Sequence, residues 1–174
     1  MPKLVVVSEK GEVIGSEDKL KCHLGQGILH KAFAVFVFNS QNQLLISRRG
    51  EEKMLWPLFW ENSCSSYPYL GEDLIVAAEK RLRKELGFTC KLKYVTKFHY
   101  QAFYEEVGAE NEVCSILMGR YDGQITPNSK EVVEWKWIGL DDLQTEIEKS
   151  PEQYAPWLVV GLKKLLPIIN RTNK

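Results

Sequence analysis

The stretch His30-Lys-Ala-Phe-Ala-Val-Phe-Val-Phe38 is a run of mostly apolar, β-prone side chains at the centre of the predicted fold. It is followed by the turn-forming residues Asn39-Ser-Gln-Asn42 and then by a second apolar run, Leu44–Ser47. Two apolar runs on either side of a short polar turn predict a β-hairpin. We therefore work outward from this hairpin to the rest of the chain.

Outside the hairpin, six stretches have the composition of strands, namely Leu4–Val7, Glu12–Ile14, Trp60–Ser63, Tyr94–Tyr104, Glu112–Tyr121 and Val132–Ile138. Three others predict helices, namely Glu72–Leu86 with Gly87 at its end, Asp141–Lys149, and the amphipathic stretch Trp157–Ile169. Strands outnumber and surround the helices. This order predicts an α/β (α+β) fold with a mixed β-sheet sandwiched between helices.

Length and composition narrow the possible classes of protein. A chain of 174 residues with 44% apolar and 26% charged side chains suits one domain, residues 1–174, with one core. The net charge of zero indicates neither a nucleic-acid-binding nor a membrane-surface protein. No apolar run reaches the roughly 20 residues of a membrane span.

The four cysteines are scattered and form no Cys-x-x-Cys pair, which argues against a zinc knuckle or a redox motif. Reduced thiols and the absence of a leader-like segment predict a cytoplasmic protein. We expect a monomer or a weak homodimer.

Two carboxylates, Glu110 and Glu112, alternate along a predicted strand and so project from one face. Close like charges repel one another unless a cation lies between them. Either a solvated acidic loop or a metal site fits this pattern, and the apolar run from Cys114 onward favours the metal site. His23 and His30 are candidate ligands because neutral imidazole binds metals readily, whereas His99 is interpreted as structural.

Arg81 and Glu85 share one face of the predicted helix, which by itself indicates an ordinary ion pair. Lys19, Arg49 and Lys53 are each unremarkable surface charges. Together with Arg81, these cations form a candidate clamp for a diphosphate, because guanidinium groups bind phosphate oxygens in pairs.

The order of these residues resembles that of the type I isopentenyl-diphosphate isomerases, a branch of the Nudix superfamily. The matching stretches are His23–Phe33, Leu44–Arg49, Trp56–Ser63, Arg81–Gly87, Glu110–Cys114 and Ala155–Trp157. The combination is specific, because generic Nudix proteins lack the two histidines and the Glu-Asn-Glu strand.

The resemblance implies a Nudix fold and a role for each matched residue. His23, His30, Glu110 and Glu112 would hold a divalent metal, which is Mg²⁺ or else Mn²⁺ or Zn²⁺, and Glu85 would bind a Mg²⁺ that bridges to the substrate. The substrate diphosphate would be bound by four cations, Lys19, Arg49, Lys53 and Arg81. Tyr100 would relay a proton beside Glu112, and Trp157 would stabilise a carbocation through its π face. The implied reaction is a 1,3-proton shift between isopentenyl and dimethylallyl diphosphate.

Two positions depart from the family pattern, in which a cysteine of a Cys-x-His-Pro segment is the second acid/base group. Here Ser65 stands at the catalytic cysteine and Tyr67 at the third metal histidine. A serine hydroxyl holds its proton far more tightly than a thiol, so we expect weak isomerase activity. The neighbouring Cys64 is predicted to face the other side of its strand.

The sequence leaves two other functions open. One is a metal-dependent Nudix diphosphohydrolase, in which the loss of a histidine at Tyr67 opens a metal position for water. The Nudix box is degenerate, however, since Arg81 and Lys84 replace two of its acidic residues. The other is a non-catalytic module that binds isoprenoid diphosphates and needs only the clamp and Trp157.

Overall fold

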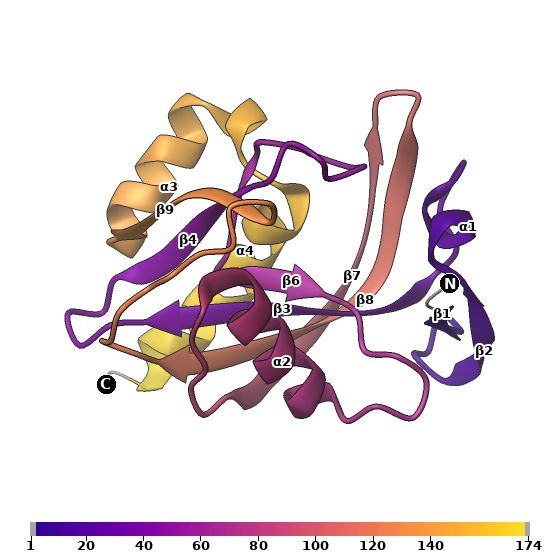
Figure 1. Cartoon of the computed structure of the whole chain (residues 1–174), viewed down its shortest axis with the longest axis horizontal. Helices are drawn as coiled ribbons and strands as arrows, with labels where there is room; N and C mark the ends of the chain where they lie inside the picture. Colours follow the sequence, from indigo (N-terminus) through magenta and orange to yellow (C-terminus); the bar gives the residue numbers. More distant parts are fainter. Residues whose placement is uncertain (1–2, 173–174) are drawn as a thin grey trace.

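The computed structural model describes residues 3–172, in which the strands form one mixed nine-stranded sheet (Figure 1). The strands are β1 (Lys3–Val7), β2 (Val13–Asp18), β3 (His30–Phe38), β4 (Leu44–Arg49), β5 (Trp60–Glu61), β6 (Cys64–Ser66), β7 (Lys93–Tyr104), β8 (Gly108–Arg120) and β9 (Val132–Ile138). The ends of the predicted domain, residues 1–2 and 173–174, lie outside the described residues.

The helices lie on both faces of this sheet, as the sequence predicts. They are α1 (Lys19–His23), α2 (Leu74–Leu86), α3 (Leu140–Lys149), the 3₁₀ turn η1 (Pro151–Gln153) and α4 (Pro156–Thr172). Figure 1 shows α2 and α4 on opposite sides of β3. None of the helices within residues 3–172 has the length and apolarity that a membrane crossing requires.

The central strand β3 is buried on both faces because its side chains alternate between two cores. Ala34 and Phe36 belong to the core under α3 and α4, whereas Phe33 and Val35 belong to the core under α2. All four side chains are at most 1% exposed. This double burial explains why the run is apolar at nearly every position.

Helix α2 has the end signals that the sequence shows. The Asp73 side chain accepts a hydrogen bond from the Val76 amide (3.0 Å), which caps the N-terminus. Gly87 ends the helix with φ of 75°, a left-handed conformation that favours glycine.

The pairing of β3, β8 and β7 aligns one row of polar side chains. β3 runs parallel to β8 with His30 opposite Glu112, and β8 runs antiparallel to β7 with Glu112 opposite Tyr100. Residues opposite one another on neighbouring strands share a face. Three residues from distant parts of the sequence therefore lie side by side.

The predicted strand Trp60–Ser63 is wrong in its second half, because β5 ends at Glu61 and β6 begins at Cys64. Asn62 donates hydrogen bonds to the carbonyls of Val35 (2.9 Å) and Cys64 (2.8 Å). Ser63 Oγ accepts from the Val37 amide and donates to the Leu45 carbonyl, both at 2.8 Å. These side chains take over bonds that a strand backbone would make.

Candidate active site

The predicted metal ligands converge on one buried point between α1, β3 and β8. Glu110 Oε2 lies 3.0 Å from His23 Nε2 and 3.7 Å from His30 Nε2. His30 Nε2 lies 3.6 Å from Glu112 Oε1. All four residues are at most 5% exposed. We refer to these four residues as the His/Glu cluster.

Both histidines of the cluster are oriented by backbone carbonyls. Nδ1 of His23 lies 2.6 Å from the Lys19 carbonyl oxygen, and Nδ1 of His30 lies 2.7 Å from that of Ile28. Because a carbonyl only accepts, each Nδ1 carries the hydrogen and donates it. In the neutral imidazole this makes Nε2 the nitrogen with the lone pair, which is the atom that can bind a metal.

Two atoms of the cluster are buried without a hydrogen-bond partner, namely His30 Nε2 and Glu110 Oε2. Such unpaired atoms are costly in a folded protein. His23, His30 and Glu110 can also offer three ligand atoms that lie within 4.8 Å of one another. A divalent cation would satisfy both unpaired atoms, so this set of nitrogen and oxygen donors fits one.

The two carboxyl groups of the cluster differ in pKa. Burial, with the charge of Glu110, raises the pKa of Glu112 to about 7. Burial also disfavours ionised Glu110, but the close contact with His23 and the positive charge of both histidines when they are protonated lower its pKa below the ordinary value. Tyr100 donates a hydrogen bond to Glu112 Oε2 at 2.6 Å. A carboxyl group with a pKa near neutrality can both give and accept a proton.

Tyr67 reaches the cluster from the position of the predicted third histidine. Its hydroxyl donates to Glu110 Oε1 (2.9 Å), and its oxygen lies 2.9 Å from His23 Nε2. Burial raises the pKa of the Tyr67 phenol well above its ordinary value, so the ring stays neutral. Its hydroxyl thus lies between two of the candidate ligands.

Ser65 and Cys64 face opposite sides of β6. Ser65 lines a small cavity of about 30 Å³ together with Glu112 and Trp157, and its Oγ lies 3.2 Å from Asn62 Oδ1. The Cys64 side chain belongs to the core under α2, and burial raises the pKa of its thiol. The prediction that Cys64 faces away from the site is confirmed.

Three of the predicted diphosphate-binding cations, Lys19, Arg49 and Lys53, line one larger cavity of about 350 Å³. This clamp cavity shares Arg49, Tyr67 and Glu110 with the small cavity. Burial lowers the pKa of Lys19, and the nearby positive charges of Arg81 and Lys53 lower it further. Concentrated positive charge of this kind favours an anionic ligand.

Arg81 does not line the clamp cavity. Its Nε donates to Glu85 Oε1 (2.7 Å), and its Nη2 lies 2.8 Å from Glu131 Oε2. Glu85 is 2% exposed and also pairs with Lys53. The cations Lys53 and Arg81 lower the pKa of Glu131 to about 2 despite its partial burial. Two acidic residues therefore neutralise part of the predicted clamp, and sequence reasoning missed Glu131.

Glu61 is a second residue that sequence reasoning missed. Its carboxylate is 3% exposed and accepts from Arg49 Nη1 and from Trp157 Nε1, both at 3.0 Å. The Arg49 guanidinium carbon lies 4.9 Å from the centre of the Trp157 ring. The signal in the sequence was a carboxylate inside a short predicted strand, a placement that usually requires a partner.

Comparisons with known proteins identify the family. The model of the NUDIX domain matches residues 28–158, so the chain belongs to the Nudix family. A crystal structure of a protein from Deinococcus radiodurans has a TM-score of 0.76 at 20% identity, covering 93% of this chain and 98% of that one. An Ap4A hydrolase from C. elegans has a TM-score of 0.57 at 16% identity, covering 80% and 97%. These similarities establish the fold.

Similarity in sequence is much higher to one branch of the family. Isopentenyl-diphosphate Delta-isomerase from Serratia proteamaculans is 35% identical over 93% of this chain and 90% of its own length. The protein of the same name from Halorhodospira halophila is 37% identical over 90% and 91%. Within the Nudix family, the chain thus belongs to the isopentenyl-diphosphate Delta-isomerase branch.

Proposed function

We propose that the chain is an isopentenyl-diphosphate Delta-isomerase that interconverts isopentenyl and dimethylallyl diphosphate by a 1,3-proton shift. The main support is one observation, the convergence of the two cluster carboxylates, Tyr100 and Trp157 around a small cavity adjoining the clamp cavity. A small substrate that carries both a diphosphate and an alkene needs a cationic cavity directly beside a site with acid/base groups. The names and coverage of the relatives support the same activity.

A divalent metal would be held by His23, His30, Glu110 and Glu112. Nitrogen and oxygen donors suit Zn²⁺ and Mn²⁺, and carboxylate oxygens suit Mg²⁺. Its positive charge would fix the cluster carboxylates and stabilise negative charge beside the substrate. We propose a second role for Glu85 at a Mg²⁺ near the diphosphate, for which its pairing with Arg81 and Lys53 would have to loosen.

The substrate would bind with its diphosphate against Lys19, Arg49 and Lys53 and with its alkene toward Trp157. The small cavity of about 30 Å³ has room for little more than one water, so the side chains around it have to separate to admit a five-carbon chain. Once closed, the same side chains would exclude water from the reacting carbons.

In the proton shift, one carbon of the allylic system gains a proton and another loses one. Glu112, hydrogen-bonded to Tyr100, would hold or receive one of these protons. The π face of Trp157 would stabilise the positive charge that forms between the two steps. Ser65 stands where the second group is needed, and the loss of one positioned acid/base group typically lowers a rate by about 10² to 10⁴. We therefore expect a slow isomerase.

The diphosphohydrolase hypothesis required an open metal position at Tyr67. The Tyr67 hydroxyl lies 2.9 Å from both His23 Nε2 and Glu110 Oε1, so it occupies the space that water would need. A non-catalytic binding module has a specific observation in its favour, because the clamp cavity is present while Ser65 lacks a titratable thiol. We keep that module as the second candidate.

The deciding experiment incubates the purified chain with isopentenyl diphosphate and Mg²⁺ and measures dimethylallyl diphosphate and released phosphate together. We expect slow formation of dimethylallyl diphosphate that Glu112→Gln abolishes. Binding of the substrate with neither product would support the binding module. Release of phosphate that Glu112→Gln abolishes would overturn the isomerase assignment.

A further inference from the structure

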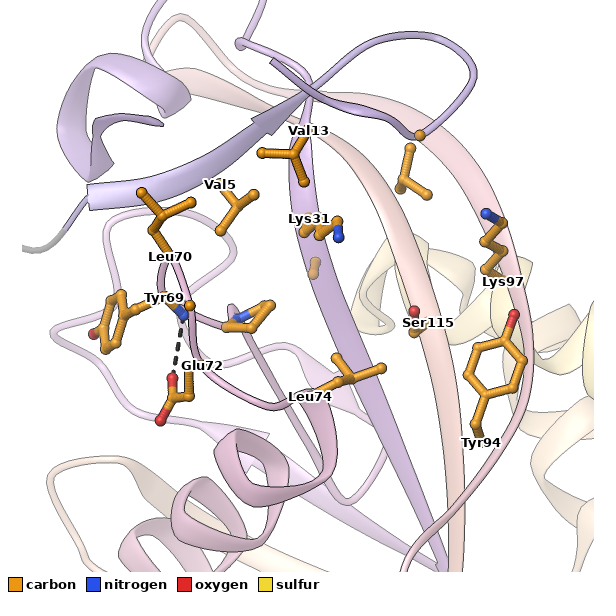
Figure 2. A pocket seen from close by; sticks show the side chains of 15 residues that line it. Val5, Val13, Lys31, Tyr69, Leu70, Glu72, Leu74, Tyr94, Lys97 and Ser115 are labelled. Atoms are coloured by element: carbon orange, nitrogen blue, oxygen red, sulfur yellow. Dashed lines mark hydrogen bonds between the residues drawn. The ribbon is translucent and has the colours of Figure 1, made fainter. Parts of the chain in front are cut away.

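A separate cavity lies on the face of the sheet opposite the His/Glu cluster (Figure 2). It has a volume of about 300 Å³ and is lined by residues of β1, β2, β3, β7 and β8, of the segment before α2 and of the start of α2. Successive side chains of a strand point to opposite faces. His30 and Glu112 point to the cluster, so their neighbours Lys31 and Val113 face this rear cavity.

One end of the rear cavity is cationic. Figure 2 shows Lys31 and Lys97 on the side where the hydroxyls of Ser115 and Tyr94 also lie. Lys31 is paired with Val113 and Lys97 with Ser115, so the two lysines flank β8 from neighbouring strands. Because β8 lies between β3 and β7, the two lysine positions are separated by two strand spacings, about 10 Å, which two extended lysine side chains can span to reach a common anion.

Within residues 3–172, neither Lys31 nor Lys97 forms an ion pair with a carboxylate. The lysines that do form ion pairs are Lys21, Lys53, Lys80, Lys84 and Lys136. The one acidic residue lining the rear cavity, Glu72, accepts from Lys80 Nζ and from the Tyr69 amide, each at 3.1 Å. Its charge is therefore already compensated. The positive charge of Lys31 and Lys97 remains available to a ligand.

The opposite end of the rear cavity is apolar. Figure 2 shows Leu70 on the side of the cavity farther from Lys97, with Val5 between Leu70 and Lys31 and with Leu74 below them. Leu70 is 60% exposed and Val13, at the rim, is 51% exposed. Covering such side chains would remove apolar surface from water, which favours association by about 25 cal/mol per Å². Cationic and apolar ends thus occur in one hollow.

We propose that the rear cavity binds a small amphipathic anion, with a phosphate or carboxylate head between Lys31 and Lys97 and a short apolar chain on Val5, Leu70 and Leu74. A volume of about 300 Å³ matches the lower end of the range for small-ligand sites. This site is independent of the proposed isomerase activity, because it uses none of the residues of the clamp cavity.

The test is calorimetric titration of the full chain with octyl phosphate and with octanoate, two probes that share a chain and differ in their heads. We expect Lys31→Ala/Lys97→Ala to weaken binding of the preferred probe about tenfold or more, the usual effect of losing charged hydrogen bonds. Leu70→Asp should weaken it as well. Leu70 is exposed, so this second variant keeps the test valid if the first one folds poorly.

Two controls locate the binding. Lys163→Ala/Lys164→Ala removes the same charge from exposed positions of α4, and Lys53→Ala removes a cation from the clamp cavity. Both should bind the probe as the natural chain does. Failure of both probes to bind, equal weakening in the Lys163/Lys164 control, or weakening by Lys53→Ala alone would each overturn the proposal.

Discussion

By the resemblance, Ser65 and Tyr67 are the residues at which this candidate active site differs from the pattern of its branch. Ser65 lines the small cavity beside Glu112, and the Tyr67 hydroxyl touches the His/Glu cluster. The scaffold around them is therefore suited to the missing thiol and imidazole. We propose that their chemistry, rather than their position, limits the proton shift.

We predict that Ser65→Cys with Tyr67→His raises isomerase activity about tenfold or more over the natural chain, the low end of acid/base effects. The thiol supplies a group that titrates nearer neutral pH, and the imidazole completes the metal ligands that hold Glu112. Ser65→Cys alone should gain less. The measurement is the rate of dimethylallyl diphosphate formation by the three variants. An unchanged rate in the double variant would contradict the proposed role of Ser65.

Glu61 connects two residues of the proposed mechanism, since each of its oxygens accepts one hydrogen bond, from Arg49 or from Trp157. Glu61→Gln replaces one acceptor by a donor and leaves a buried N–H unpaired, which costs about 1–3 kcal/mol. We predict that kcat falls about tenfold or more through misplacement of Trp157. The same change should matter much less in a Trp157→Phe background, because the indole N–H is then absent.

The control for this double-mutant cycle is Glu134→Gln, which removes a carboxylate from an exposed ion pair with Arg48. It should leave kcat unchanged. Equal losses from Glu61→Gln in both backgrounds would show that Glu61 acts only through the general stability of the site.

At the scale of elements, the contact between β8 and α1 places two site residues. Lys19 and His23 lie at the two ends of the short helix α1. A Cβ on Gly108 of β8 would lie 2.2 Å from the His23 carbonyl oxygen, a distance at which the backbone must shift. Only glycine lets the strand approach the helix so closely.

We predict that Gly108→Ala displaces α1 and weakens metal binding, while most of the fold is kept. The matched control is Gly15→Ala in β2, where an added Cβ meets no atom within 4 Å. Calorimetric titration with Mn²⁺ measures the difference between the two variants. Identical affinities would show that α1 does not position His23 in the way we describe.

Elements with a regular apolar pattern could be predicted from the sequence, and short elements held by polar contacts could not. Strand β3 and helix α2 follow from composition and from the Gly87 stop signal. The five residues of α1 include no apolar repeat, and this helix is too short to show one. The break after Glu61 depends on Asn62 and Ser63 bonding to distant carbonyls, which no local pattern shows.

The ligands of the candidate metal site could be predicted from the sequence, but the counter-charges around the cations could not. Alternation along β8 placed Glu110 and Glu112 together, and the branch resemblance added His23 and His30. The counter-charges Glu61 and Glu131 were missed because each meets its partners only after the chain has folded back. Arg49 and Glu61 are 12 positions apart, and Arg81 and Glu131 are 50 apart.

At the scale of the whole molecule, metal binding and stability should be linked, because the unfolded chain does not assemble the His/Glu cluster. We predict that Mn²⁺ at about 100 times its dissociation constant stabilises the fold by about 2.7 kcal/mol, which raises Tm by several degrees. Glu110→Gln/Glu112→Gln should lose this increase and its bound metal.

The control is Glu51→Gln/Glu52→Gln, which removes two exposed carboxylates outside the cluster. Thermal unfolding with and without Mn²⁺, together with metal analysis, checks the prediction. Equal metal content in the cluster variant and the natural chain would refute the metal site.

The position of the His/Glu cluster behind the clamp cavity also predicts the order in which the metal and the substrate bind. His23 and Glu110 line the clamp cavity, whereas His30 is fully buried, so this cavity provides a route by which a cation can reach the cluster. A diphosphate seated against Lys19 and Lys53 would close that route. The cation would have to load first, and its exchange would stop for as long as substrate or product stayed bound. A chelator should then remove the metal quickly from the ligand-free protein and slowly from the protein with substrate or product bound.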